Sequence, residues 1–222
     1  MFQRNRFAAF LFDMDGTLLT SIAATERVWT RWAERHGLDV PSFLATIHGK
    51  RAADTIAQQG IPGIDVEAES QWIFEAEMAD TDGIESAAGI AAFLAALPPE
   101  RWAVVTSALR PLAERRMAAA GLTIPEVIVA AEDVTRGKPA PDGFRLAAER
   151  LGVPVEDCLV FEDSPAGIEA GKAAGASVIA ITGFQNDAHV THEPNVRDYE
   201  HLRPAIAHDG ALLLETSAPA QP

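Results

Sequence analysis

Short apolar runs that stop abruptly at polar residues recur along this chain. Each run is followed by a stretch in which apolar residues return with helical spacing. This alternation of strand and helix patterns predicts an α/β fold in which a parallel sheet carries helices on both faces. The runs that we assign to strands are 7–12, 102–105, 127–130, 158–161 and 177–181.

The helical stretches are separated by glycine and proline breaks, and they fall into two groups. No strand pattern interrupts 21–82, so we interpret this block as a small α-helical cap inserted into an α/β core that consists of 1–20 and 83–222. The predicted helices are 22–36, 51–59, 66–79, 87–96, 111–120, 143–151, 165–174 and 199–207. Residues 217–222 are expected to be a disordered tail.

Some residues in these helices carry specific packing expectations. In the helix over 165–174, glycines recur every fourth residue and are expected to permit close approach to the sheet; they are Gly167, Gly171 and Gly175. The large aromatic side chains of the block over 21–82 are expected in its own apolar core; they are Trp29, Trp32, Trp72 and Phe74.

Composition narrows the class of protein. A chain of 222 residues with 48% apolar residues suits one domain plus an insertion, and no apolar stretch approaches the ~20 residues that span a bilayer. No signal peptide is recognisable, so we expect a cytoplasmic protein without a membrane partner. The net charge of −14 argues against nucleic-acid binding, and no protein partner is evident. The single cysteine, Cys158, is expected to be a small buried apolar residue.

Two carboxylates, Asp13 and Asp15, end the first apolar run. Their alternate positions on an extended chain direct both side chains to the same side. Buried charge of this kind needs a compensating partner, such as a metal ion or a phosphoryl group. One carboxylate can then attack or coordinate while the other transfers a proton. The alternative interpretation is a hairpin, because Asp15-Gly16 between apolar flanks is a good turn signal.

Polar residues also follow the other strands. Ligands of parallel α/β sheets bind outside the carboxyl ends of the strands, so these residues should converge on one edge. A loop over 136–142 should hold Lys138 near the same edge, although a lone loop lysine is usually solvated. The polar residues that end the later strands are Thr106 and Ser107, then Glu162 and Asp163.

Taken in order, these motifs resemble those of the haloacid dehalogenase-like hydrolases over about the first 183 residues. The motifs are Asp13-x-Asp15-x-Thr17, Thr106-Ser107, Gly137-Lys138-Pro139, and Glu162-Asp163 followed by Ser164-Pro165-Ala166-Gly167. Segments 47–51 and 97–102 are similar to the sugar phosphatase branch, which includes hexitol phosphatases, 2-deoxyglucose-6-phosphatases and glycerol-3-phosphatases. The β-phosphoglucomutases are more distant. The resemblance implies a Rossmann-like core with a cap.

The resemblance also suggests roles for the acids. Asp13 would take the phosphoryl group as an aspartyl phosphate, and Asp15 would protonate the leaving alkoxide and later deprotonate water. Magnesium would be bound by Asp13, the backbone carbonyl of Asp15, Asp163 and Glu162. The alternative for the last segment is helix capping, which explains Ser164 and the following proline but not the adjacent acids.

The remaining candidates would bind the substrate. Thr106 and Ser107 would hold the phosphate, although Ser107 could instead cap the next helix. Lys138 would neutralise charge on the phosphoryl oxygens. The cap residues would contact the remote part of the substrate, or else form a solvated basic loop; they are His48, Lys50 and Arg51.

These inferences predict a magnesium-dependent phosphatase of small sugar or polyol phosphates. A phosphosugar mutase is disfavoured because Ala52 and Thr25 stand where mutases resembling this chain carry an arginine and a histidine. Dehalogenases lack an equivalent of Asp15. A non-catalytic phosphate-binding module remains a third alternative. The sequence leaves the individual substrate open.

Overall fold

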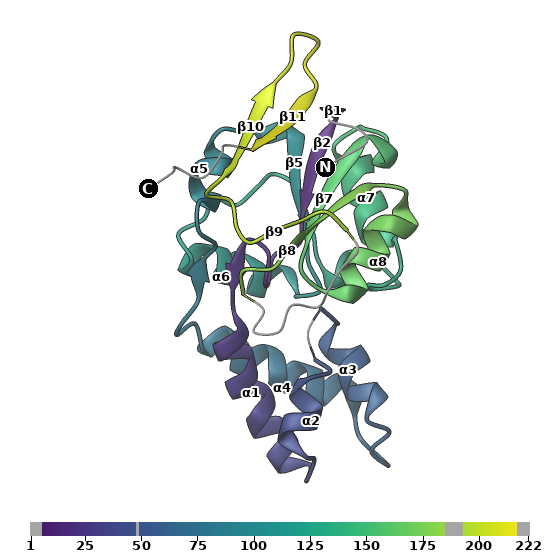
Figure 1. The fold of residues 1–222 in the computed structure, drawn as a ribbon. Helices are drawn as coiled ribbons and strands as arrows, with labels where there is room; N and C mark the ends of the chain where they lie inside the picture. The colour runs from purple at the N-terminus through teal and green to yellow at the C-terminus, as the bar shows by residue number, and fades with distance from the viewer. Residues whose placement is uncertain (1–5, 48, 185–192, 217–222) are drawn as a thin grey trace.

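The computed structural model describes residues 6–47, 49–184 and 193–216 (Figure 1). Its centre is a sheet in which every neighbouring pair of strands is parallel, in the order β6-β5-β2-β7-β8-β9. The strands are β2 (Ala9–Phe12), β5 (Trp102–Val105), β6 (Ile128–Val129), β7 (Cys158–Glu162), β8 (Ser177–Ile181) and β9 (Asn195–Val196). The predicted parallel α/β fold is therefore confirmed.

Alternate residues of the central strands face opposite layers of the protein. Phe10 and Phe12 pack into one apolar cluster with α5 (Ile90–Ala95) and α6 (Arg110–Ala119). Ala9 and Leu11 pack on the other face with α7 (Asp142–Arg150) and α8 (Pro165–Ala174). Because both faces are covered, β2 is buried throughout and ends between β5 and β7. Cys158 lies in the second cluster as a buried free thiol, as expected.

Four helices form a separate layer at one end of the molecule (Figure 1). They are α1 (Ile22–Arg35), α2 (Val40–Leu44), α3 (Ala52–Gln58) and α4 (Val66–Ala79). We call them the helical unit; a two-stranded ribbon of β3 (Leu19–Thr20) and β4 (Glu85–Ser86) connects it to the sheet. Trp29 and Trp32 lie in its own apolar cluster and Trp72 packs against that cluster, as predicted. Phe74 is not part of that cluster and lines a cavity, which Trp29 also borders.

The C-terminal part corrects one prediction. Residues 199–207 do not form a helix; β10 (Leu202–Ile206) pairs antiparallel with β11 (Leu212–Thr216), which also pairs with β1 (Arg6–Phe7). Pro204 lacks the backbone donor that a helix interior needs. The turn contains Asp209-Gly210, with Gly210 at φ +83°, and this dipeptide is a hairpin signal in the sequence. The hairpin projects from the end opposite the helical unit (Figure 1).

Gly167 and Gly171 of α8, and Gly175 at its C-terminal cap, have different roles. A Cβ at Gly171 would lie 2.9 Å from Val178 of the sheet, so this residue does permit close approach. A Cβ at Gly167 would overlap the Glu162 carboxyl group. For Gly175 the packing prediction is wrong, because nothing lies within 4 Å; it ends the helix in the left-handed conformation at φ +95°.

The predicted tail over 217–222 lies outside the described residues. Within the part of the chain that is described, no helix has both the length and the apolar character needed to cross a bilayer.

Candidate functional site

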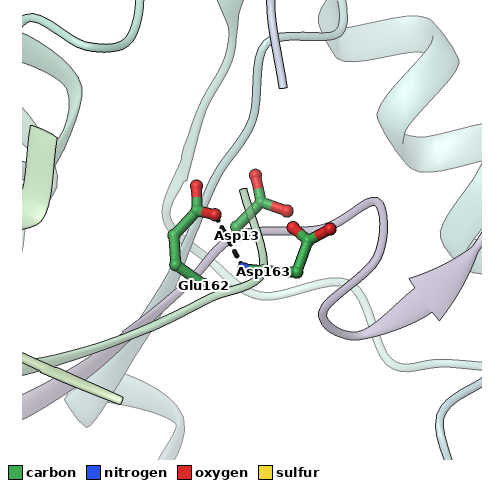
Figure 2. Close-up of side chains that lie close together, drawn as sticks. All are labelled: Asp13, Glu162 and Asp163. Atoms are coloured by element: carbon green, nitrogen blue, oxygen red, sulfur yellow. Dashed lines mark hydrogen bonds between the residues drawn. The ribbon is translucent and has the colours of Figure 1, made fainter. Parts of the chain in front are cut away.

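Three carboxylates meet where two neighbouring strands end (Figure 2). Asp13 follows β2, and its backbone N–H donates to the Phe161 carbonyl of β7 at 2.9 Å. Glu162 ends β7 and Asp163 follows it. One carboxylate oxygen from each acid lies within 4.8 Å of the others. The parallel pairing of β2 and β7 thus brings together acids that are about 150 positions apart in the sequence.

Lys138 provides the positive charge at this cluster. Its ammonium group donates to Asp13 Oδ1 and, at 2.6 Å, to Glu162 Oε1. The side chain is only 6% exposed, so the solvated-loop alternative is wrong. Burial lowers the pKa of Lys138, but the two carboxylates outweigh that effect and raise it, so the lysine stays charged.

Glu162 is held firmly in place. Its Oε2 accepts from the backbone N–H groups of Asp163 and Ser164, both at 2.8 Å, and from the Ser164 hydroxyl at 3.1 Å. Ser164 also caps α8 by accepting from the Gly167 N–H, as the capping interpretation predicted. Both oxygens of Glu162 therefore already accept hydrogen bonds from the protein. Asp13 and Asp163 form the side of the cluster that faces the cavity.

Two acids of this cluster have raised pKa values, although Lys138 lies beside them. Burial, opposed by Lys138 and reinforced by Glu162, raises the pKa of Asp13 from 3.8 to about 7. Burial and then the neighbouring Glu162 and Asp13 also raise the pKa of Asp163 well above its ordinary value. A hard divalent cation bound by carboxylate oxygens would relieve both shifts, so the residues present fit magnesium.

Asp15 points to different partners. Its Oδ1 accepts from the Ser21 hydroxyl at 2.5 Å, and its Oδ2 accepts from Arg116 Nη1 at 3.0 Å. The hairpin alternative is wrong, because the strand after Gly16 pairs with β4 rather than with β2. Gly16 is at φ +90°, and a Cβ there would lie 2.1 Å from Asp163 Oδ2, so only glycine fits this turn.

Sequence reasoning missed Arg116. This side chain is 6% exposed, and its Nη2 contacts Thr25 Oγ1 at 3.0 Å and Glu77 Oε1 at 3.2 Å, in α1 and α4 of the helical unit. A signal was available: Arg116 falls on the buried stripe of α6 with Leu112, Ala113 and Met117. A charge on a buried stripe indicates a partner inside the protein.

Thr106 and Ser107 lie at the end of β5 on the same edge. The Thr106 hydroxyl accepts from the Ala108 N–H at 3.1 Å. Ser107 donates to the Gly49 carbonyl at 3.1 Å, which links the core to the loop before α3. The capping alternative for Ser107 is wrong, because α6 begins at Arg110 after Leu109.

Lys50 and Arg51, in the loop before α3, are engaged by the protein. Arg51 pairs with Asp54 at 2.7 Å and donates to the Thr135 carbonyl of the core at 3.2 Å. Lys50 donates to the Gln58 side chain at 3.1 Å. Lys50 and Arg51 therefore do not form a purely solvated loop. Their donor groups are also not free to bind a ligand, because they already have partners in the protein. His48 lies outside the described residues.

A cavity of about 770 Å³ lies between the strand edge and the helical unit. The site residues of the core that line it are Asp13, Asp15, Thr106, Ser107, Arg116 and Asp163. The helical unit contributes Thr25, Trp29, Lys50, Arg51, Phe74 and Glu77, among others. The volume accommodates a small metabolite. Asp13, Asp15 and Asp163 therefore open into a chamber that lies between two layers of the protein.

Comparison with known proteins agrees with this arrangement. The family model for haloacid dehalogenase-like hydrolases matches residues 7–175. Hexitol phosphatase A from Escherichia coli is 45% identical over 79% of this chain and 83% of its own length. Glycerol-1-phosphate phosphohydrolase 2 from Saccharomyces cerevisiae is 35% identical over 81% of this chain and 76% of its own.

A solved structure shows the same fold. CbbY from Rhodobacter sphaeroides, in complex with phosphate, superposes with a TM-score of 0.72 at 26% identity, over 87% of this chain and 95% of that one. The segment that the family model matches, 7–175, contains the acids, Lys138 and the helical unit. This chain belongs to the haloacid dehalogenase-like hydrolase family.

Proposed function

We propose that this protein is a magnesium-dependent phosphatase that hydrolyses small sugar or polyol monophosphates through an aspartyl phosphate on Asp13. The observation that carries the proposal is the buried contact of Lys138 with Asp13 and Glu162, next to a cavity that Asp13 and Asp163 line. The names of the relatives, which are phosphatases of hexitol and glycerol phosphates, support the same reaction class.

The first step forms a bond between a carboxylate oxygen of Asp13 and phosphorus while the bond from phosphorus to the alcohol oxygen breaks. Lys138 holds Asp13 in position and offsets the charge of the transferring group. Glu162 fixes Lys138 from the other side. Thr106 and Ser107 lie at the same edge, where their hydroxyl and N–H groups would receive the phosphate.

Asp15 would transfer the protons. It would protonate the departing alkoxide, and the resulting carboxylate would then take a proton from the water that attacks the aspartyl phosphate. Ser21 and Arg116 place this carboxylate at the border of the core and the helical unit. This arrangement gives the two aspartates of one loop different tasks.

Asp13, Asp163 and the Asp15 carbonyl would hold magnesium, which when bound shields the acids from the charge of the phosphate. Glu162 belongs to the same cluster, and its satisfied oxygens suit an orienting role. The four-helix layer over 22–79 would serve as the cap that excludes water from the chamber.

Charges around the chamber favour a substrate whose end remote from phosphorus is uncharged. Its described lining contains three cations, Lys50, Arg51 and Arg116, and six carboxylates, of which three are the site acids Asp13, Asp15 and Asp163. Each arginine already pairs with a carboxylate, Arg51 with Asp54 and Arg116 with both Asp15 and Glu77. A second phosphate or a carboxylate would therefore find no arginine in the described lining that lacks a carboxylate partner. Neutral hydroxyl groups would instead find many acceptors.

The test is release of inorganic phosphate, with magnesium, from hexitol, hexose, glycerol and glycolate phosphates and from a hexose bisphosphate. We expect the neutral polyol or sugar monophosphates to have the highest kcat/KM, and Asp13→Asn, which is nearly isosteric, to abolish turnover. Release of phosphate from no substrate would support a binding module. Transfer of the phosphoryl group to a second hydroxyl, detected by phosphorus NMR, would support a mutase.

A further inference from the structure

Arg116 occupies an unusual position for a charged residue. It lies on the buried stripe of α6, yet its guanidinium group reaches three other elements: the loop after β2, α1 and α4. A buried charge persists only where partners compensate for its lost hydration. Glu77 alone would neutralise it. The contact of Nη1 with Asp15 therefore requires a separate explanation.

One terminal nitrogen of the Arg116 guanidinium group contacts the core, and the other contacts the helical unit. Nη1 donates to Asp15 Oδ2 at 3.0 Å, while Nη2 contacts Thr25 Oγ1 at 3.0 Å and Glu77 Oε1 at 3.2 Å. Because the group is planar and rigid, fixing Nη2 also fixes the direction of Nη1. The helical unit thus sets the direction from which Asp15 is held.

We propose that Arg116 is a positioning residue that orients the Asp15 carboxylate for proton transfer, and that Glu77 and Thr25 fix Arg116 in turn. The inference rests on the proposed function, because it assigns Arg116 to the proton-transfer half of that reaction. Ser21 holds the other oxygen of Asp15, so the carboxylate is clamped between the start of α1 and Arg116. The position of the helical unit relative to the core then determines whether the Asp15 carboxylate is oriented for proton transfer.

The chain offers a matched control. Arg115 is the neighbour of Arg116 and also links α6 to α4, through a hydrogen bond to the Met78 carbonyl at 2.5 Å. It is not among the residues that line the chamber. Arg115→Met therefore removes one arginine contact between the same two helices without touching Asp15.

Two substrates separate proton transfer from other roles. A polyol phosphate has an alkoxide leaving group that needs a proton, whereas the leaving group of p-nitrophenyl phosphate departs without one. We expect Arg116→Met to lower kcat for the polyol phosphate about 100-fold, within the range that general acid catalysis supplies. The first burst of p-nitrophenolate and the KM values should change little. Arg115→Met should leave both substrates unaffected.

Further variants keep the test decisive. Arg116→Lys retains the charge but not the planar fork, and Glu77→Gln retains an acceptor but not the charge, so both should show a smaller loss with the same selectivity. If Arg116→Met does not fold by circular dichroism, these two variants decide. Equal losses on both substrates, or a change in KM alone, would overturn the inference.

Asp15→Asn separates this inference from the proposed function. If the wild-type protein releases no phosphate, the proposed function fails before any variant is compared. If Asp15→Asn shows the selective loss but the Arg116 variants do not, only the role of Arg116 is refuted.

Discussion

Replacing Gly167 with alanine tests whether close packing of α8 against Glu162 holds the site in place. The residue is the third of α8, where alanine would ordinarily favour the helix by about 1 kcal/mol. In this protein the added Cβ would lie 1.5 Å from Glu162 Oε1 and 1.9 Å from its carboxyl carbon. Glu162 is fully buried and bonded to Lys138 and to the N–H groups of Asp163 and Ser164, so it cannot move aside freely.

The expected magnitude follows from those contacts. Hydrogen bonds to a charged group contribute about 1.5–3 kcal/mol each. Loss of two of them, less the gain in helix propensity, lowers the free energy of unfolding by about 2–5 kcal/mol. Displacement of Glu162 also frees Lys138 from one of its two anchors. We therefore expect turnover to fall at temperatures where the variant is still folded.

Gly171→Ala is the matched control, because it makes the same change one helical turn later. Its Cβ would meet Val178 at 2.9 Å and Val160 at 3.2 Å, so it overpacks apolar side chains without touching the acids. Overpacking costs about 1–3 kcal/mol, which the helix propensity of alanine partly offsets. We expect some loss of stability and unchanged kcat/KM.

The assay combines urea unfolding, followed by circular dichroism, with phosphate release at a temperature where both variants are folded. Glu162→Asp in the Gly167→Ala background shortens the carboxylate, and it should restore part of the lost stability in a double-mutant cycle. If Gly167→Ala is as stable and as active as the wild-type protein, Glu162 does not occupy the position that the structure gives it.

Three further predictions concern the same site and its surroundings. Lys138→Met leaves Asp13 and Glu162 without their cation, so the free energy of unfolding should fall by about 3–5 kcal/mol and turnover should be lost; an unchanged urea midpoint would contradict the buried contacts. In chelated protein, the raised pKa of Asp13 means that the native state retains a proton that the unfolded chain has released, so stability should fall as pH rises from 3.8 to about 7. Magnesium should then raise the Tm more at about pH 8 than at about pH 5.5, where protons compete with it, and an Asp163→Asn variant should lose this response; equal shifts at both pH values would remove Asp13 from the metal site. The Tyr199 hydroxyl is buried without a hydrogen-bond partner among the described residues, so Tyr199→Phe should raise the free energy of unfolding by about 1 kcal/mol, and a clear decrease in urea unfolding would show that the hydroxyl is paired.

The position of the acids could be predicted from the sequence, because the apolar runs locate the strands and the parallel topology places the strand ends at one edge of the sheet. Each apolar run is short, continuous and followed by a helix, which fixes the strand direction. Parallel strands then bring their carboxyl ends to one edge wherever they lie in the sheet. Asp13, Lys138, Glu162 and Asp163 were therefore predictable as a group. The structure places carboxylate oxygens of the three acids within 4.8 Å of one another and Lys138 in contact with Asp13 and Glu162.

Contacts between layers were decided only by the tertiary structure. Periodicity reports whether a side chain faces the interior, but it does not report what it meets there. The ion pairs of Arg116 with Asp15 and Glu77 join segments that are far apart in the sequence, and the overlap of a Gly167 Cβ with Glu162 depends on the exact seating of α8. The pairing of the hairpin after Tyr199 also depends on the tertiary structure, because β11 pairs with β1 at the other end of the chain. Such partners are selected by packing and by the need to compensate buried charge, which no local pattern contains.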